Sequence, residues 1–69
     1  MKTYHIRAWV KGREIYDDDI TDEVNSMANR LECPARNAAK RIALGYKRCR
    51  PAAVLQLRME EIIDLDDML

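Results

Sequence analysis

The sequence predicts an α+β fold, in which a small β-hairpin and a third strand form a sheet with two helices packed on one face. Three observations predict it: alternating apolar and polar residues near the N-terminus, two stretches with helical apolar spacing in the middle, and a second alternating stretch after Pro51. The chain has 69 residues, of which 48% are hydrophobic and 35% charged. Because so short a chain buries only about 60% of its surface on folding, we expect residues 1–69 to form a single small domain.

The first strand is predicted from Thr3 to Val10, where apolar and polar side chains alternate. Lys11-Gly12 then fits a two-residue turn, because glycine adopts a positive φ at low cost, and Arg13 to Tyr16 form the returning strand. In a regular hairpin Ala8 faces Ile15 and Arg7 faces Tyr16. One face is then apolar, with Ile6, Ala8 and Ile15, and the second face carries His5, Arg7, Trp9, Glu14 and Tyr16.

The first helix is predicted to start near Asp19 or Thr21 and to end near Leu31. The aspartates at 17–19 supply acceptors for free amides and suit the positive end of a helix dipole. Pro34 disfavours the helical conformation in the residue before it and cannot donate its own amide. One apolar stripe follows the helical period: Ile20, Val24, Met27, Ala28 and Leu31.

The second helix is predicted from Pro34 or Ala35 to Leu44, with Gly45 in the position of a left-handed C-cap. Alanines give this helix a thin face suited to close packing. Its other faces and the segment that leads to Pro51 carry the basic residues Arg36, Lys40, Arg41, Lys47, Arg48 and Arg50.

The stretch 52–63 fits either a strand or a helix, and we favour a strand over Val54 to Met59 because a hairpin alone is marginally stable. Residues 60–69 form an acidic amphipathic C-terminal segment, expected as a short helix or as a segment that orders on binding. The expected core consists of Ile6, Ala8, Ile15, Val24, Met27, Leu31, Ile42, Leu55 and Leu57.

The charges cancel overall but are sorted along the chain. Between Arg30 and Arg50, seven cationic side chains face a single acid, Glu32, whereas residues 60–67 contain five acids and no base. Such sorting creates local potentials of opposite sign that bear on binding partners. No apolar run is long enough for a membrane span and no export signal is evident, so we expect a cytoplasmic protein with reduced Cys33 and Cys49.

Catalysis is not expected. Cys49 is the one candidate with an activating argument, because Arg48 and Arg50 would lower the pKa of its thiol, but we favour a thiol that is packed in the fold or incidentally near solvent. Cys33 and Cys49 are 16 residues apart and His5 is the only histidine, which does not fit a zinc site. We therefore predict no catalytic residue, no metal and no cofactor.

The stretch 24–42 partly resembles a helix-turn-helix, with Ala28 at a small-residue position and Ala38 at an apolar position of the second helix. It departs from that pattern at Glu32, where the turn usually has glycine, and at Arg41, where a hydrophobe is usual. The resemblance implies an alternative function as a DNA-binding transcriptional regulator. The residues that would face the major groove are Arg36, Asn37, Lys40 and Arg41.

The preferred hypothesis is a non-catalytic binding protein, as a monomer or a homodimer, that inhibits or regulates a larger cellular protein. Its layout is similar to that of the small regulators and inhibitors that bacteriophages and other mobile elements encode, a resemblance of size and layout without a shared motif. One contact surface is predicted from residue types enriched at binding hot spots: Arg7, Trp9 and Tyr16. A second is predicted from the basic residues, through which nucleic acid is also a possible partner: Arg36, Lys40, Arg41, Lys47, Arg48 and Arg50.

Overall fold

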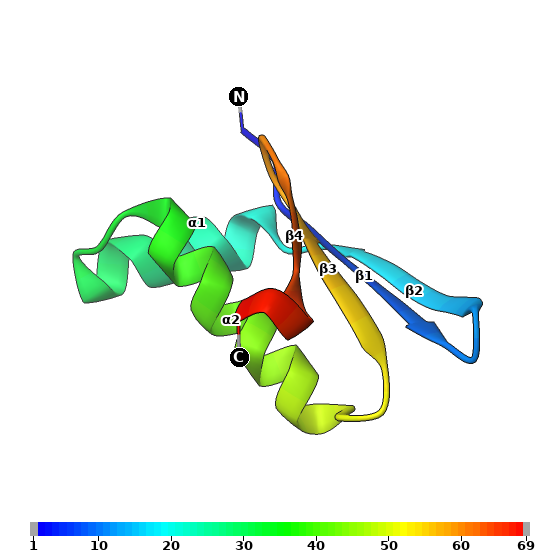
Figure 1. Cartoon of the computed structure of the whole chain (residues 1–69). Coiled ribbons are helices and arrows are strands. Elements are labelled where there is room, and N and C mark those ends of the chain that lie inside the picture. Colours follow the sequence, from blue (N-terminus) through cyan, green and yellow to red (C-terminus); the bar gives the residue numbers. More distant parts are fainter. Residues whose placement is uncertain (1, 69) are drawn as a thin grey trace.

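The computed structural model describes residues 2–68 and has a four-stranded antiparallel sheet with two helices on one face (Figure 1). The elements in chain order are β1 (His5–Val10), β2 (Arg13–Asp19), α1 (Thr21–Leu31), α2 (Ala35–Cys49), β3 (Val54–Arg58), β4 (Ile62–Asp64) and the 3-10 helix η1 (Leu65–Met68). The strand order is β2-β1-β3-β4, so β2 and β4 are the edges of the sheet. The α+β class, the hairpin and the strand near residues 54–59 are confirmed.

A β-bulge in the hairpin overturns the predicted register. Lys11 and Gly12 have φ values of 52° and 75°, as expected for a two-residue hairpin turn. Beyond the turn, Trp9 pairs with Glu14 but Ala8 pairs with Tyr16, so Ile15 is an extra residue without a partner. One added residue reverses the face to which the following side chains point. Ile15 is therefore 37% exposed and was wrongly assigned to the core.

The three aspartates after Tyr16 continue β2 to Asp19, and α1 begins at Thr21. Asp19 Oδ1 accepts a hydrogen bond from the Thr21 amide at 2.9 Å, so this aspartate serves the helix terminus from the end of the strand. Hydrogen bonds from the Thr21 side chain and backbone lower the pKa of Asp19. At the other end, α1 stops at Leu31 as predicted, and Glu32 takes the left-handed conformation with φ of 52°.

The helix α2 does not end before Gly45 but continues to Cys49. Glycine inside a helix costs about 1 kcal/mol relative to alanine, and packing of the following turn offsets this cost. Tyr46 is half-buried, and the side chain of Lys47 is only 14% exposed. The predicted C-cap at Gly45 is thus wrong, and Lys47 and Arg48 belong to the helix.

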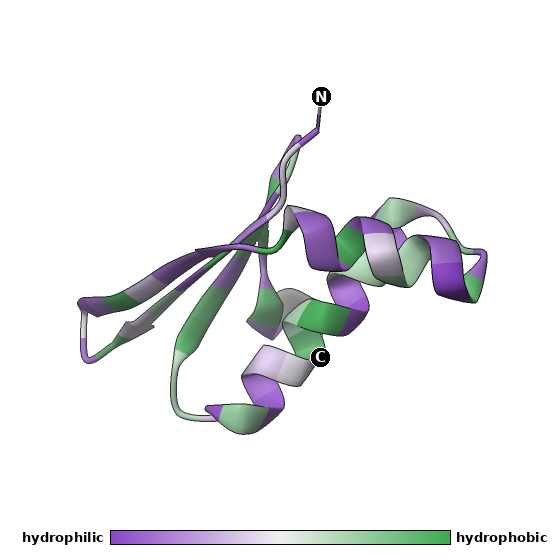
Figure 2. Ribbon diagram, turned by 180° about the vertical axis from the view of Figure 1, so that it is seen from behind, coloured by the Kyte–Doolittle hydropathy of each residue, from purple (hydrophilic) through white to green (hydrophobic). Residues whose placement is uncertain are grey.

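The core lies between the sheet and α2, where fully buried alanines let the helix approach the strands closely. Figure 2 shows the hydrophobic bands of the helices beside strands in which hydrophobic and hydrophilic residues alternate. Of the expected core, Ile6, Ala8, Val24, Leu55 and Leu57 are buried. Met27 and Ile42 are half-buried, and Leu31 is exposed and was wrongly included with Ile15. The buried residues that were not predicted are Tyr4, Ile20, Ala38, Ala39, Ala43, Ala53 and Leu65.

The C-terminal segment is part of the fold, and its strand β4 was not predicted. β4 pairs antiparallel with β3, and Leu65 at the start of η1 is fully buried against β3, β4 and α2. No helix within residues 2–68 is long and apolar enough to cross a membrane.

Candidate functional site: a groove between β2 and α2

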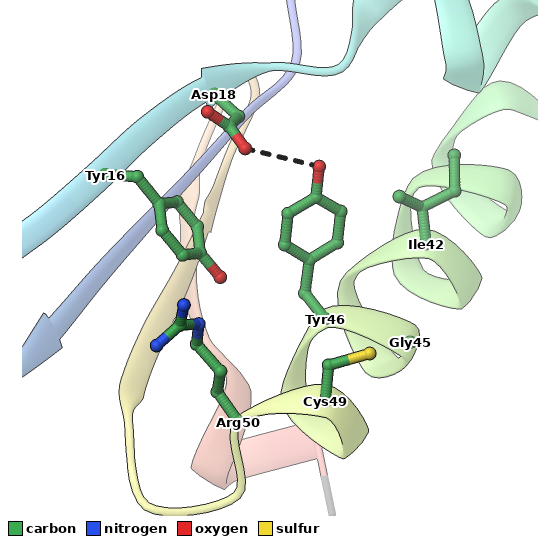
Figure 3. Close-up of a pocket in the computed structure, with 7 residues that line it drawn as sticks. All are labelled: Tyr16, Asp18, Ile42, Gly45, Tyr46, Cys49 and Arg50. Carbon is green, nitrogen blue, oxygen red and sulfur yellow. Dashed lines mark hydrogen bonds between the residues drawn. The ribbon is translucent and has the colours of Figure 1, made fainter.

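An open groove of about 500 Å³ lies between the edge strand β2 and the C-terminal half of α2 (Figure 3). The strand contributes Tyr16 and Asp18 to it. The remaining lining residues come from α2 and the residue after it: Ile42, Gly45, Tyr46, Cys49 and Arg50. The exposed surface inside the groove is almost entirely apolar. The groove therefore offers apolar contact area next to the sheet edge that β2 forms.

Two tyrosines form the walls of the groove. The ring centroids of Tyr16 and Tyr46 are 5.9 Å apart with an interplanar angle of 56°, a tilted arrangement favourable for aromatic pairs. Burial is the main cause that raises the pKa of each tyrosine, so both hydroxyls remain protonated near neutral pH. The Tyr46 hydroxyl donates to Asp18 Oδ2 at 3.4 Å, which orients this ring toward the strand.

Charged groups and a thiol lie at the margins of the groove. Asp18 stands on the strand side, and the guanidinium of Arg50 lies beside the Tyr16 ring (Figure 3). Cys49 is a free, exposed thiol in the last turn of α2. A bound segment would thus contact apolar and aromatic surface in the middle and one charge of each sign at the margins.

Two features of the sequence create the groove. The bulge at Ile15 turns Tyr16 toward the helix side of the sheet, where it meets Tyr46. Gly45 leaves the facing surface of α2 without a side chain, and a Cβ atom built there meets no atom within 4 Å. A larger residue at position 45 would therefore occupy space in the groove.

The predicted surface of Arg7, Trp9 and Tyr16 is divided between two faces of the sheet. Arg7 and Trp9 lie on the face away from the helices, where the guanidinium carbon is 5.0 Å from the centroid of the Trp9 ring. Arg7 Nε also donates to Glu14 Oε1 at 3.0 Å. Tyr16 lies on the opposite face, in the groove, because of the bulge.

The predicted basic surface is divided as well. Arg36 pairs with Glu61, and Lys47 Nζ donates to the Ala53 carbonyl at 2.6 Å while lying 3.4 Å from Asp66 Oδ1. These two cations hold the C-terminal segment against α2. Arg50 lines the groove, Arg41 and Arg48 are exposed, and Lys40 is half-exposed. Among the side chains that the structure describes, these last three form no ion pair.

The groove residues on α2 were not predicted as a site, although one signal was available. Ile42, Tyr46 and Cys49 are spaced four and three residues apart, which places them on one helix face. An aromatic residue that continues the alanine face of a basic helix indicates contact with another element. Tyr46 contacts Tyr16, whose side chain points to the helix side of the sheet only because of the bulge. The predicted register placed Tyr16 on the opposite face.

Comparison of the chain with models of protein families, with curated proteins and with solved structures finds no match. Within residues 2–68, no three His, Cys, Asp or Glu side chains are arranged to hold a metal ion.

Proposed function

We propose that this protein is a non-catalytic binding protein, and that the groove between β2 and α2 docks a segment of a larger protein partner, which is thereby inhibited or redirected. The observation that carries the proposal is an apolar, aromatic-walled groove of about 500 Å³ on a chain of 69 residues. This volume falls in the range of about 300 to 1,000 Å³ that is typical of small-molecule pockets, so it has room for a few side chains of a bound segment.

The composition of the groove supports a protein partner. Tyrosine and arginine are enriched at the energetic centres of protein interfaces, and Tyr16, Tyr46 and Arg50 line this groove. Tyrosine also provides a large contact area with few rotatable bonds, so little conformational entropy is lost on binding. The tyrosine hydroxyls and Asp18 add polar groups that fix the orientation of a bound segment.

DNA binding through α2 is less well supported. The helix uses its alanine face for the core, and Arg36 and Lys47 are engaged by acids of the C-terminal segment. The chain as a whole has a net charge of zero, whereas neutralisation of phosphates provides much of the affinity for DNA. Of the cations on α2 that form no ion pair with a described side chain, Arg41 and Arg48 are exposed and Lys40 is half-exposed.

The test is affinity capture from a cell lysate, with and without nuclease, by three immobilised forms of the protein. Gly45→Leu places a bulky side chain in the groove, and its Cβ atom meets no other atom within 4 Å. The control Asn37→Leu adds the same side chain at an exposed position of α2 outside the groove. We expect a nuclease-resistant protein partner to be retained by the wild type and by Asn37→Leu but lost by Gly45→Leu. Equal retention by all three forms would remove the groove as the docking site, and retention that nuclease abolishes would favour nucleic acid.

A further inference from the structure

The free edge of β2 adjoins the groove. We propose that the segment bound there is extended and basic, and that it adds to β2 as a fifth strand of the sheet while its apolar side chains enter the groove. This inference rests on the proposed function and specifies the chemistry of the partner. Three features of β2 support it: its open backbone edge, the direction of its side chains and the charges beside them.

The backbone of β2 is available on its outer side. β2 is the first strand in the order β2-β1-β3-β4, and β1 is the one strand with which it pairs, through all of its residues except Ile15. No other backbone hydrogen bond reaches residues 13–19 within the part of the chain that the structure describes. All of these residues except Tyr16 are exposed. Main-chain hydrogen bonds to such an edge provide affinity for an extended peptide whatever its sequence.

The side chains of an added strand would reach the groove. Tyr16 pairs with the buried Ala8 and Asp18 with the buried Ile6, so both point to the helix side of the sheet. Side chains of a neighbouring strand alternate between faces with the same period of two. Every second residue of an added segment therefore points toward the aromatic walls, which favours apolar residues at these positions.

The charges at the edge select a basic segment. Four acids lie on β2, at Glu14 and at residues 17–19, against one cation, Arg13. On the outer face Arg7 pairs with both Glu14 and Asp17, and His5 also lies near Asp17. Among the side chains that the structure describes, Asp18 and Asp19 form no ion pair, and Arg50 is the cation at the groove margin. Opposite charges on adjacent strands stabilise their pairing, and like charges oppose it. Lysine or arginine at the positions between the apolar residues would thus complement the acids of β2.

The same acids argue against a second copy of this chain as the occupant. When two β2 strands pair antiparallel about a symmetry axis at Tyr16, Glu14 faces Asp18 and Ile15 faces Asp17. With the axis at Asp17, this aspartate faces its own copy. Charged side chains on an edge strand commonly prevent self-association, and here they leave the edge open to a partner of opposite charge.

The test uses the full chain and synthetic peptides labelled with a fluorophore, and binding is measured by anisotropy at low and moderate salt. The main probe is a nine-residue peptide in which lysine alternates with valine or leucine. A second peptide has glutamate in place of lysine. In an extended peptide the N–H groups of alternate residues point to the same edge. Two further peptides therefore carry N-methyl groups on the odd or on the even residues, so that each peptide has one blocked backbone edge and unchanged side chains.

We expect the lysine peptide to bind, with an affinity that falls as salt increases. The glutamate peptide and one of the two N-methylated peptides should bind at least about tenfold more weakly, because each lacks one of the two recognition features. Gly45→Leu should weaken binding by a similar factor and Asn37→Leu should not. Bound peptide should also slow alkylation of Cys49, which lines the groove, and leave that of Cys33 unchanged.

The outcomes separate this inference from the proposed function. If both N-methylated peptides bind as well as the parent, strand addition is wrong. If the glutamate peptide binds as well as the lysine peptide, the charge argument is wrong. If none of the peptides binds, the extended basic segment is wrong. In all three cases the groove remains the proposed docking site so long as capture from lysate is still lost in Gly45→Leu.

Discussion

Truncation of Leu65 tests whether the C-terminal segment is an integral part of the fold. Leu65 is fully buried against β3, β4 and α2. Leu→Ala changes in cores cost about 2 to 5 kcal/mol, through the lost transfer free energy and the cavity that remains. A domain of this size has a free energy of unfolding of about 3 to 5 kcal/mol. Leu65→Ala should therefore remove most of this stability.

The assay is urea denaturation followed by the fluorescence of Trp9, the single tryptophan, and by far-UV circular dichroism. With a urea slope of about 1 kcal/mol per M, a loss of about 3 kcal/mol lowers the midpoint by about 3 M. The matched control is Ile62→Ala, which shortens an aliphatic side chain that is 60% exposed in the same segment. The control should cost less than about 1 kcal/mol. A midpoint for Leu65→Ala equal to that of Ile62→Ala would refute the inclusion of this segment in the core.

Three further substitutions have defined outcomes. Gly45→Ala should raise the free energy of unfolding by about 1 kcal/mol, and the melting temperature by about 4 to 8 °C, because alanine favours the helix and the space is open; an unchanged melting temperature would contradict a helical Gly45. Lys47→Ala should cost about 1 to 3 kcal/mol in chemical denaturation, because the Ala53 carbonyl loses its donor, whereas the exposed Arg48→Ala should stay within about 0.5 kcal/mol. Asp19→Ala should lower the melting temperature at pH 7. The pKa of Asp19 is lower in the folded than in the unfolded protein, so the ionised carboxylate stabilises the fold above the ordinary pKa of 3.8. This stabilisation is lost as the pH falls through the folded-state pKa. A melting-temperature difference between Asp19→Ala and wild type that persisted at lower pH would contradict the assigned hydrogen bonds.

Local sequence signals were sufficient where one element could be recognised by its own residues. The turn at Lys11-Gly12, the end of α1 before Pro34 and the third strand follow from backbone preferences and apolar periodicity. Gly45 shows the limit of such signals, because the same glycine can end a helix or continue one. The packing of Tyr46 and the burial of Lys47 continue it here, and both depend on residues far away in the chain.

The candidate site shows the same limit more strongly. The residue types of a binding surface, Tyr16 and the basic residues of α2, could be selected from the sequence. Their grouping could not, since it required the bulge at Ile15 and the ion pairs of Arg36 and Lys47 with the C-terminal segment. Tyr46 was missed because it forms a wall of the groove only together with Tyr16, which is 30 residues away in the sequence.

The sequence by itself determined the α+β class, the hairpin, the two helices and the sorting of charge, because these properties depend on residues close together along the chain. The tertiary structure alone decided the face on which Tyr16 lies, the length of α2, the fourth strand and the groove. The reason is that strand register and groove shape depend on contacts between distant segments, where a single extra residue such as Ile15 reverses the face of every side chain that follows it in the strand.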